Sequence, residues 1–253
     1  MQQIPSEDPT TLYNTAMAQE NSGNLDGAYQ TFIRVWEKYP KDELAPKALY
    51  NAASITALTN PSRAGNLYRS FIDAYPDSVL LPKVNRELLD LYIKGKNYTD
   101  GSRLFMDMYA QNKVTEMVSP GIDLGVGLVE TKQYFNALEI IAMIYPLSDR
   151  ESSDMLLDMW SATLEDIDQV EMLAKLENTA LDNQLFEILL ARQARLYLEQ
   201  EDRDIASKIM DRLRNKTMQS PSPGLSKKST IGVVVPLSGK WKSVGQKVLK
   251  GVE

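Results

Sequence analysis

The sequence predicts an all-α protein built from repeated helical hairpins, and two observations support this prediction. First, a Tyr-Pro pair closes a helical pattern at Tyr39-Pro40 and again at Tyr75-Pro76, 36 residues later. Second, the stretches before these two pairs share one template of small and large apolar residues. Because proline cannot continue a helix, each unit is predicted to be helix, turn, helix and stop.

The shared template consists of residues at four fixed distances before each proline. These are Val35, Phe32, Ala28 and Ala16 in the first unit, and Phe71, Tyr68, Ala64 and Ala52 in the second. The spacing from Ala28 through Phe32 to Val35 is the i, i+4, i+7 stripe of an amphipathic helix. A small residue lets two antiparallel helices approach closely, and a large residue at the next turn fills the gap. These residues are therefore predicted to form the core of each hairpin.

These residues and offsets resemble the tetratricopeptide repeat, which has small residues at its eighth and twentieth positions, an aromatic residue at its twenty-fourth and proline at its thirty-second. The resemblance implies a solenoid of stacked hairpins. A third unit (Leu89, Tyr98, Gly101, Phe105, Met108) and a fourth (Gly125, Tyr134, Ala137, Ile141, Ile144) follow the pattern without proline at the expected place. Residues 151–185 fit it poorly, and residues 186–215 recover it through Ala194, Ala206, Met210 and Leu213. We expect about five or six hairpins.

The composition of the chain changes near Lys216, where the helical pattern ends. Residues 217–229 are rich in Ser, Pro, Gly and Lys, which is typical of a linker. Residues 230–253 open with the β-branched run around Val233 and then continue as a turn and the beginning of a helix. We therefore expect a helical repeat domain over 1–216, a linker over 217–229, and a short C-terminal β-α fragment over 230–253 that is the truncated start of an α/β domain.

The segment IGVVVPLSGKWKSVGQKVLKGVE resembles the first strand and helix of type I periplasmic binding proteins, which close on amino acids and similar ligands. In that family the PLSG turn, here Pro236 to Gly239, and the glycine spacing from Gly245 to Gly251 lie near the ligand cleft. Helical repeats followed by this fold are the arrangement of outer-membrane lipoproteins that activate penicillin-binding proteins, and the sequence resembles that family. The resemblance implies a non-catalytic interaction scaffold that docks on and stimulates a peptidoglycan synthase, and a periplasmic location with a lipid anchor in the outer membrane.

Two other functions fit the same features. The repeats would be a positioning domain if the chain belonged to an amino-acid-type periplasmic solute-binding receptor, and a small-molecule cleft in the lobes beyond residue 253 would distinguish that class. The YPKD and YPDS motifs at residues 39–42 and 75–78 also resemble those of outer-membrane assembly and cell-division coordinator lipoproteins. That last class would lack a β-rich segment after the repeats.

The composition excludes several kinds of chemistry and partner. The 253 residues include no cysteine and no histidine, which excludes disulfides, thiolate nucleophiles, most zinc sites and imidazole relays. The formal net charge of −6, with both signs interspersed, argues against a nucleic-acid surface. No run of 18 apolar residues and no signal segment occurs, so we expect membrane contact only through a lipid anchor that this sequence does not contain. The expected partner is a protein, a peptide or a glycan.

Pairs of carboxylates can act as acid and base without histidine, so they are the remaining catalytic candidates. The sets are Glu7-Asp8, Asp42-Glu43, Glu165-Asp166 with Asp168, and Glu201-Asp202 with Asp204. Each set is predicted to lie in a polar turn or near a helix end, where acidic side chains are solvated. No glycine-containing loop of oxygen ligands follows Asp168. We expect no catalytic residues, no metal site and no cofactor.

The resemblance to tetratricopeptide repeats implies that a protein partner binds the inner helix faces. In this sequence the corresponding candidate residues are Tyr13, Asn14, Met17, Leu49, Arg86 and Asp90. A second candidate contact is the basic set Lys227, Lys228, Lys240, Lys242, Lys247 and Lys250. Such lysines can contact anionic cell-wall polymer such as peptidoglycan, or lipid head groups, or they can simply keep a linker and a helix face soluble.

Overall fold

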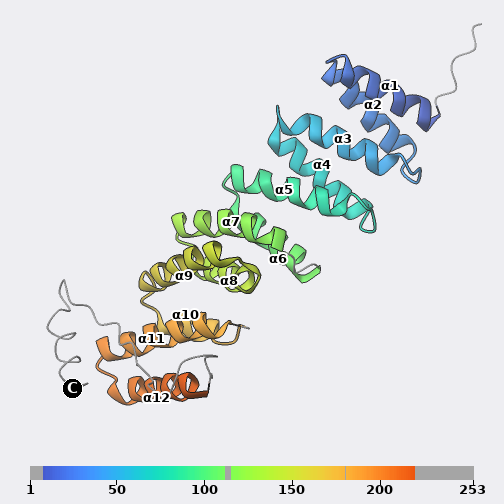
Figure 1. Cartoon of the computed structure of the whole chain (residues 1–253). Coiled ribbons are helices and arrows are strands. Elements are labelled where there is room, and N and C mark those ends of the chain that lie inside the picture. The colour runs from blue at the N-terminus through green and yellow to red at the C-terminus, as the bar shows by residue number, and fades with distance from the viewer. Residues whose placement is uncertain (1–7, 112–114, 180, 220–253) are drawn as a thin grey trace, which may run out of the picture. The chain divides into compact units, whose positions relative to one another are not determined.

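A computed structural model describes residues 8–111, 115–179 and 181–219 of the chain, and every regular element in these ranges is helical (Figure 1). The predicted all-α class, a tetratricopeptide-like solenoid of helical hairpins, is therefore confirmed. The last helix ends at Gln219 rather than near Lys216. The β-α fragment expected over 230–253 and the linker beyond Gln219 lie outside the described residues.

The helices are numbered in chain order, and η1 and η2 are short 3-10 helices. Their bounds are α1 Pro9–Asn21, α2 Leu25–Lys38, α3 Ala45–Ala57, α4 Pro61–Ala74, α5 Leu81–Lys94, α6 Tyr98–Gln111, η1 Thr115–Met117, α7 Val118–Glu130, α8 Tyr134–Ile144, η2 Tyr145–Leu147, α9 Arg150–Glu165, α10 Val170–Leu176, α11 Asn183–Glu199 and α12 Arg203–Gln219. Within the described ranges, no helix is long and apolar enough to cross a membrane.

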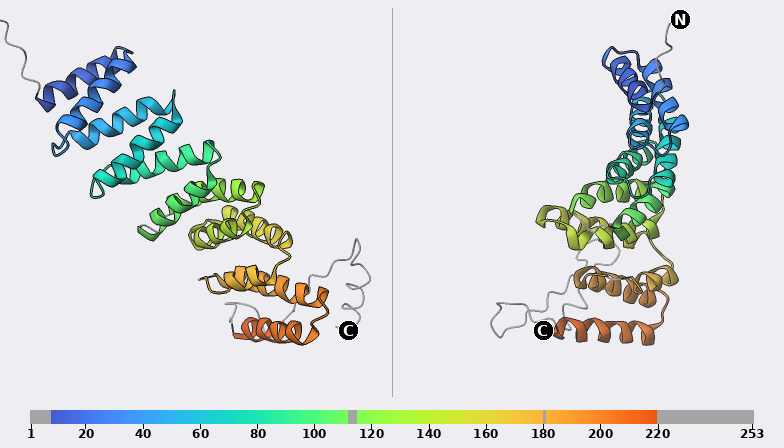
Figure 2. Two further views of the ribbon diagram at one scale, coloured as in Figure 1. Left: turned by 180° about the vertical axis from the view of Figure 1, so that it is seen from behind. Right: turned by 90° about the vertical axis from the view of Figure 1, so that its right-hand side faces the viewer.

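The chain divides into a compact unit, Met1–Met210, and a second unit, Asp211–Glu253, of which the structure describes only the end of α12. In the first unit, α1 packs on α2, α3 on α4, α5 on α6 and α7 on α8, and α2 packs on α3 as α4 does on α5. Figure 2 shows this order of helices from two further sides. Contacts between neighbours in the chain are what defines a stacked-repeat architecture.

Buried positions in the first helix of each hairpin recur every 36 residues. The sets are Ala48, Leu49, Ala52 and Ala53 in α3, then Val84, Asn85, Leu88 and Leu89 in α5, then Pro120, Gly121, Leu124 and Gly125 in α7. The same spacing leads from Leu124 to Trp160 in α9, which has no exposed surface. Residues 151–185 therefore continue the repeat, although the large Trp160 hides it from a template that requires small residues.

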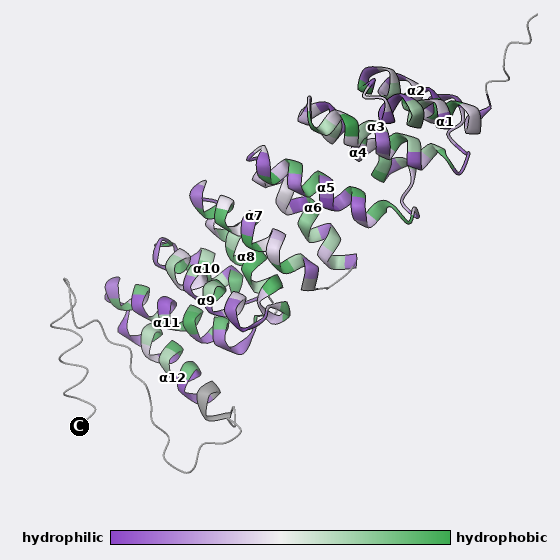
Figure 3. Cartoon of the chain, turned by 45° about the horizontal axis from the view of Figure 1, so that its top comes forward, coloured by the Kyte–Doolittle hydropathy of each residue, from purple (hydrophilic) through white to green (hydrophobic). Residues whose placement is uncertain are grey.

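The second helices supply the large side chains of the core. Phe32, Tyr68 and Phe105 occupy corresponding positions in α2, α4 and α6, and all three are fully buried. Ala16, Ala28, Ala52 and Ala64 are fully buried between them. Burying each phenylalanine contributes about 1.5–3 kcal/mol. Figure 3 shows hydrophobic and hydrophilic residues on each helix, as the amphipathic pattern predicts.

Four of the turns inside the hairpins share one backbone conformation: those between α1 and α2, α5 and α6, α7 and α8, and α11 and α12. Gly23, Lys96, Lys132 and Glu201 all have positive φ values, of 80°, 55°, 60° and 65°. The next residue donates its backbone N–H to a carbonyl five residues earlier, as Asn24 does to Gln19 at 2.9 Å and Gln133 does to Leu128 at 2.8 Å. This is the Schellman end of a helix, and it sets the path into the next helix of the hairpin.

The second Tyr-Pro pair also joins the first two hairpins. The Tyr75 hydroxyl donates a hydrogen bond of 2.9 Å to the carbonyl of Pro40, so the two motifs contact each other across the repeat. A third pair, Tyr145-Pro146, was overlooked because it comes earlier than the template expects. It forms η2 directly after α8, which has 11 residues where α2 and α4 have 14. The shorter α8 places η2 close to α9.

Candidate functional site

The predicted partner-binding residues on α1 and α5 are accessible to a partner. Asn14 and Arg86 are exposed, and Tyr13, Met17 and Asp90 are partly exposed. Contacts described below connect them to further residues of α3 and α5. We call the whole set the N-terminal face; it comprises Tyr13, Asn14, Met17, Tyr50, Asn51, Lys83, Arg86, Glu87 and Asp90.

Leu49 does not belong to this surface, contrary to the sequence-based expectation. Its side chain has no exposed area and packs in a core cluster with Phe71, Val84 and Leu88. Tyr13, 36 residues earlier in the repeat, remains partly exposed. The same repeat position is therefore core in α3 and surface in α1, because α4 and α5 both cover Leu49.

Asn51 connects the two predicted residues of α1. Its side-chain amide donates a hydrogen bond of 3.1 Å to the Tyr13 hydroxyl and lies 3.6 Å from the Met17 sulfur. The Tyr13 ring packs edge-on against the buried Phe32, with 5.5 Å between ring centroids. Tyr13 and Met17 are therefore held in place by neighbours from α2 and α3 before any partner binds.

A carboxylate and two phenols connect α3, α4 and α5. Glu87 accepts a hydrogen bond of 2.5 Å from the Tyr50 hydroxyl and a second from the Tyr68 hydroxyl. Burial raises the pKa of both phenols, and the hydrogen bonds to Glu87 raise it further, so both phenols stay protonated. The Lys83 ammonium lies 4.6 Å from the centre of the Tyr50 ring. Both Glu87 oxygens are engaged, so the cluster positions side chains and offers no general base.

Arg86 is placed between α5 and the start of the fourth hairpin. Its guanidinium lies 3.3 Å from the Asp90 carboxylate and donates a hydrogen bond of 3.3 Å to the carbonyl of Glu116. The arginine side chain keeps 44% of its surface exposed. At this exposure the ion pair itself contributes little stability, about 0–1 kcal/mol, and the guanidinium can still contact a partner.

The 36-residue register would have identified the surface residues that were missed. Moving along the register from Asn14 leads to Tyr50, then Arg86, then Ile122. Sequence reasoning selected Leu49 instead of its neighbour Tyr50 and did not extend the set to α7. The structure places Ile122 in a groove.

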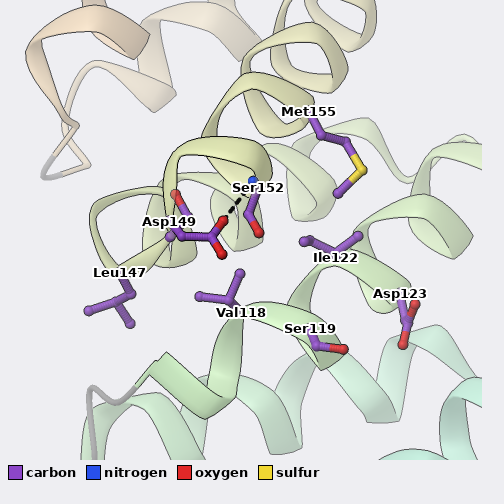
Figure 4. Close-up of a pocket in the computed structure, with 9 residues that line it drawn as sticks. Val118, Ser119, Ile122, Asp123, Leu147, Asp149, Ser152 and Met155 are labelled. Carbon is purple, nitrogen blue, oxygen red and sulfur yellow. Dashed lines mark hydrogen bonds between the residues drawn. The ribbon is translucent and has the colours of Figure 1, made fainter.

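This groove lies between α7 and the segment formed by η2 and the start of α9, and its volume is about 670 Å³. Nine residues line it: Val118, Ser119, Ile122, Asp123, Leu147, Ser148, Asp149, Ser152 and Met155. Figure 4 shows Val118 and Ile122 on α7 opposite Ser152 and Met155 on α9. Asp149 caps α9 by accepting a hydrogen bond of 2.8 Å from the Ser152 backbone N–H, which lowers the pKa of its carboxyl. We call this the α7–α9 groove.

Charge is distributed unevenly along the chain. Residues 8–111 contain twelve acidic and eleven basic side chains, and residues 181–219 contain seven of each. Residues 115–179, which include the α7–α9 groove, contain thirteen acidic and three basic side chains. The interspersed charge expected from the whole sequence therefore describes the two outer ranges but not the middle one.

The candidate carboxylates at Glu165 and Asp168 are partners of a buried arginine. Arg192 is only 5% exposed, and its guanidinium donates hydrogen bonds of 3.0, 3.1 and 3.0 Å to the carbonyls of Leu164, Glu165 and Ile167. It also lies 3.5 Å from the carboxylates of Glu165 and Asp168. The arginine thus donates to carbonyls at the end of α9 and just after it, where the helix supplies few donors of its own. These carboxylates have a structural role.

In the other described carboxylate sets, Asp8 and Asp202 cap helices and Asp42 stabilises the turn before α3. Asp8 accepts a hydrogen bond from the backbone N–H of Thr11, Asp42 from that of Leu44, and Asp202 from that of Ile205. Glu7 lies outside the described residues. Among the residues that the structure describes, no three acidic side chains come together as a metal site would require.

Comparison with known proteins agrees with this geometry. Residues 10–42 match the Tetratricopeptide repeat family. The matched range contains α1 and α2 and ends after the first Tyr-Pro pair, so it is one tetratricopeptide repeat. No curated protein matches the sequence.

Several solved structures of low sequence identity match the chain with TM-scores below 0.5. A tetratricopeptide repeat protein from Parabacteroides merdae ATCC 43184 has a TM-score of 0.46 and 13% identity, over 82% of this chain and 79% of its own. MamA from Desulfovibrio magneticus RS-1 has a TM-score of 0.41 and 12% identity, over 86% and 99%. PilF from Pseudomonas aeruginosa has a TM-score of 0.40 and 15% identity, over 84% and 93%.

Proposed function

We propose that the chain is a non-catalytic scaffold whose N-terminal face binds a protein partner. The observation that supports this proposal is a set of aromatic, amide and charged side chains in three hydrogen-bonded groups: Tyr13 with Asn51, Tyr50 with Glu87, and Arg86 with Asp90. Tyrosine and arginine are enriched in the residues that dominate binding energy at protein interfaces.

The side chains of this set are already ordered by their neighbours. The amide of Asn51 holds Tyr13, and Glu87 holds Tyr50. Ordering a free side chain at an interface costs about 0.5–1.5 kcal/mol, so side chains fixed beforehand favour binding. The same hydrogen bonds that join the first three repeats thus prepare a binding surface.

We propose further that the partner is a peptidoglycan synthase of the penicillin-binding class, and that the full-length protein is an outer-membrane-anchored lipoprotein facing the periplasm. The support for this proposal is the order of sequence features: helical repeats, the linker-like stretch 217–229, and the PLSG-containing segment resembling a type I periplasmic binding domain. Under this proposal the repeats dock on the synthase and the complex stimulates its activity.

The proposal is tested with the full chain immobilised on a biosensor and a purified, detergent-solubilised penicillin-binding protein as analyte. Arg86→Glu is expected to weaken binding about tenfold, because it reverses an exposed charge in the N-terminal face. Arg103→Glu is the matched control: Arg103 is also exposed and paired with one acidic side chain of its own helix, at 3.2 Å, but it lies on α6. This control is expected to bind like the wild type.

Each outcome has a defined meaning. Absence of binding by the wild-type chain contradicts the synthase as partner. Equal losses for Arg86→Glu and Arg103→Glu contradict the N-terminal face as the docking surface. Binding of a free amino acid by the full-length protein, without binding to a synthase, would favour the solute-receptor alternative.

A further inference from the structure

The α7–α9 groove combines an apolar floor with acidic edges. Val118, Ile122, Leu147 and Met155 supply the apolar part of the lining. Met155 leaves 46% of its surface exposed, and Val126, one turn after Ile122 on α7, leaves 43%. Apolar side chains that stay accessible beside a concave space are typical of a binding site.

The acidic part of the groove consists of Asp123 on α7 and Asp149 at the start of α9. On α9, Glu151, Asp154 and Asp158 are exposed as well. Between Val118 and Met155 the sequence has two basic residues, Lys132 and Arg150. Arg86 of α5, which reaches the Glu116 carbonyl, is already bound to Asp90. The thirteen acidic and three basic side chains of residues 115–179 give this region a negative potential.

We propose that the α7–α9 groove binds a basic segment of a partner protein, in which one or two apolar side chains enter the groove and flanking lysines or arginines face Asp123 and Asp149. This inference rests on the proposed scaffold function, because it names the chemistry of a second segment that the scaffold holds. The groove and the N-terminal face are separate surfaces, so a partner can use both.

Charge and size favour this occupant. A volume of about 670 Å³ falls within the range of about 300–1,000 Å³ of pockets that hold small ligands, and it exceeds the space that one leucine fills. An acidic segment would be repelled by Asp123 and Asp149. Two copies of this chain that met groove to groove would bring like charges together. A basic segment with an apolar anchor satisfies both the lining and the charge.

The test uses the full chain and short fluorescein-labelled peptides, with binding measured by fluorescence anisotropy. The probe peptide has one leucine in a Gly/Ser backbone with two lysines on each side. Two matched peptides replace either the lysines by glutamate or the leucine by serine. The lysine-leucine peptide is expected to bind at least about tenfold more tightly than either matched peptide, and more weakly as salt is raised.

Two variants locate the binding site. Asp123→Lys reverses the charge of an exposed groove residue, and Met155→Ser removes an exposed apolar one. Each is expected to weaken the probe about fivefold or more. Asp73→Lys is the control, because Asp73 is an exposed acidic residue on α4, outside the groove, and the charge change is the same. It is expected to bind the probe like the wild type.

Three results would overturn the inference: binding of the three peptides with equal affinity, equal weakening by Asp73→Lys and Asp123→Lys, or a dimer in sedimentation velocity that Asp123→Lys dissociates. The last result would assign the groove to a second copy of the chain.

The synthase assay with the same variants separates the two proposals. If only the groove proposal fails, Arg86→Glu still weakens binding to the synthase. Failure of the scaffold function removes synthase binding from every variant.

Discussion

Residues 8–111 and residues 115–179 repeat the same hairpin but differ in regularity and charge. In the first region, six helices of 13 or 14 residues are built on small residues and aromatics, and acidic and basic side chains are nearly equal in number. In the second, two 3-10 helices interrupt the pattern, α10 has seven residues, and acidic side chains dominate. The regular region offers an ordered surface, and the irregular region opens a groove.

The difference shows where a regular repeat can form a groove. The buried core positions recur every 36 residues from α3 to α9, so both regions have the same hairpin architecture. The groove lies where α8 ends early: Tyr145-Pro146 begins η2, and Leu147 and Asp149 line the groove together with residues of α7.

The largest expected effect comes from removing one large core side chain in each region. Phe32→Ala and Trp160→Ala are each expected to lower the free energy of unfolding by about 3–5 kcal/mol, because both side chains are fully buried. In stacked repeats the damage stays local, so hydrogen exchange should lose protection around α1–α3 in the first variant and around α9–α11 in the second.

The surface variant Met155→Ala, on the same helix as Trp160, is expected to change stability by no more than about 0.5 kcal/mol. Uniform loss of protection along the whole chain in both core variants would show that the two regions unfold as one unit. That result would contradict the expectation that each core variant loses protection only in its own region.

The next effect concerns the buried arginine, a feature that the first region lacks among its described residues. Arg192→Met is expected to lower stability by about 2–3 kcal/mol in urea denaturation, because three carbonyls, two of them in buried hydrogen bonds, lose the arginine donor. Arg195→Met removes an exposed partner of Glu165, at 2.6 Å, and should cost less than about 1 kcal/mol. Equal losses would indicate that the carbonyl contacts of Arg192 contribute nothing.

A smaller effect follows from the turns of positive φ. The first hairpin uses Gly23 at this position and the fourth uses Lys132. Gly23→Lys should destabilise by about 1 kcal/mol, and Lys132→Gly should stabilise by up to about 1 kcal/mol, since glycine adopts this conformation without strain. A side chain at Gly23 meets no neighbour within 4 Å, so thermal denaturation of this variant reports backbone strain alone. Two changes of the same sign would contradict this explanation.

The smallest effect is the dependence on pH of the caps of α1 and α9. Hydrogen bonds from Thr11 and from Ser152 lower the pKa of Asp8 and Asp149 below the usual value of 3.8. The stabilisation by each charged cap is therefore present above pH 3.8 and is lost as pH falls through the lower, folded-state pKa. Carboxyl NMR titration should give both values below 3.8, and a value at or above 3.8 would contradict the cap assignment.

The sequence was sufficient to predict the fold of the first region because its core positions hold residues of contrasting size. Ala16, Ala28, Phe32 and Val35 can be recognised in sequence because the next repeat copies them. In α9 the register of Ala16 is occupied by Trp160, and in α11 the register of Leu12 is occupied by Arg192, whose burial depends on carbonyls 25 to 28 residues earlier. A buried polar side chain whose hydrogen-bond partners lie far away in the sequence leaves no local sequence pattern.

The candidate surface was predictable only in part. Asn14 and Arg86 were selected because the resemblance to tetratricopeptide repeats points to the inner helix faces, and both side chains are exposed. Leu49 was wrongly placed on the surface, because its burial depends on how closely α4 and α5 pack. The α7–α9 groove was missed because it depends on the early ending of α8, which shifts the third Tyr-Pro pair out of the expected position.

The most direct test of the scaffold function is hydrogen–deuterium exchange of the full chain with and without a purified penicillin-binding protein. The account predicts new protection in α1, α3 and α5, with a second protected segment at α7 and the start of α9 when the partner supplies a basic segment. Unchanged exchange throughout α1, α3 and α5 at saturating partner would contradict the proposal that the N-terminal face is a docking surface.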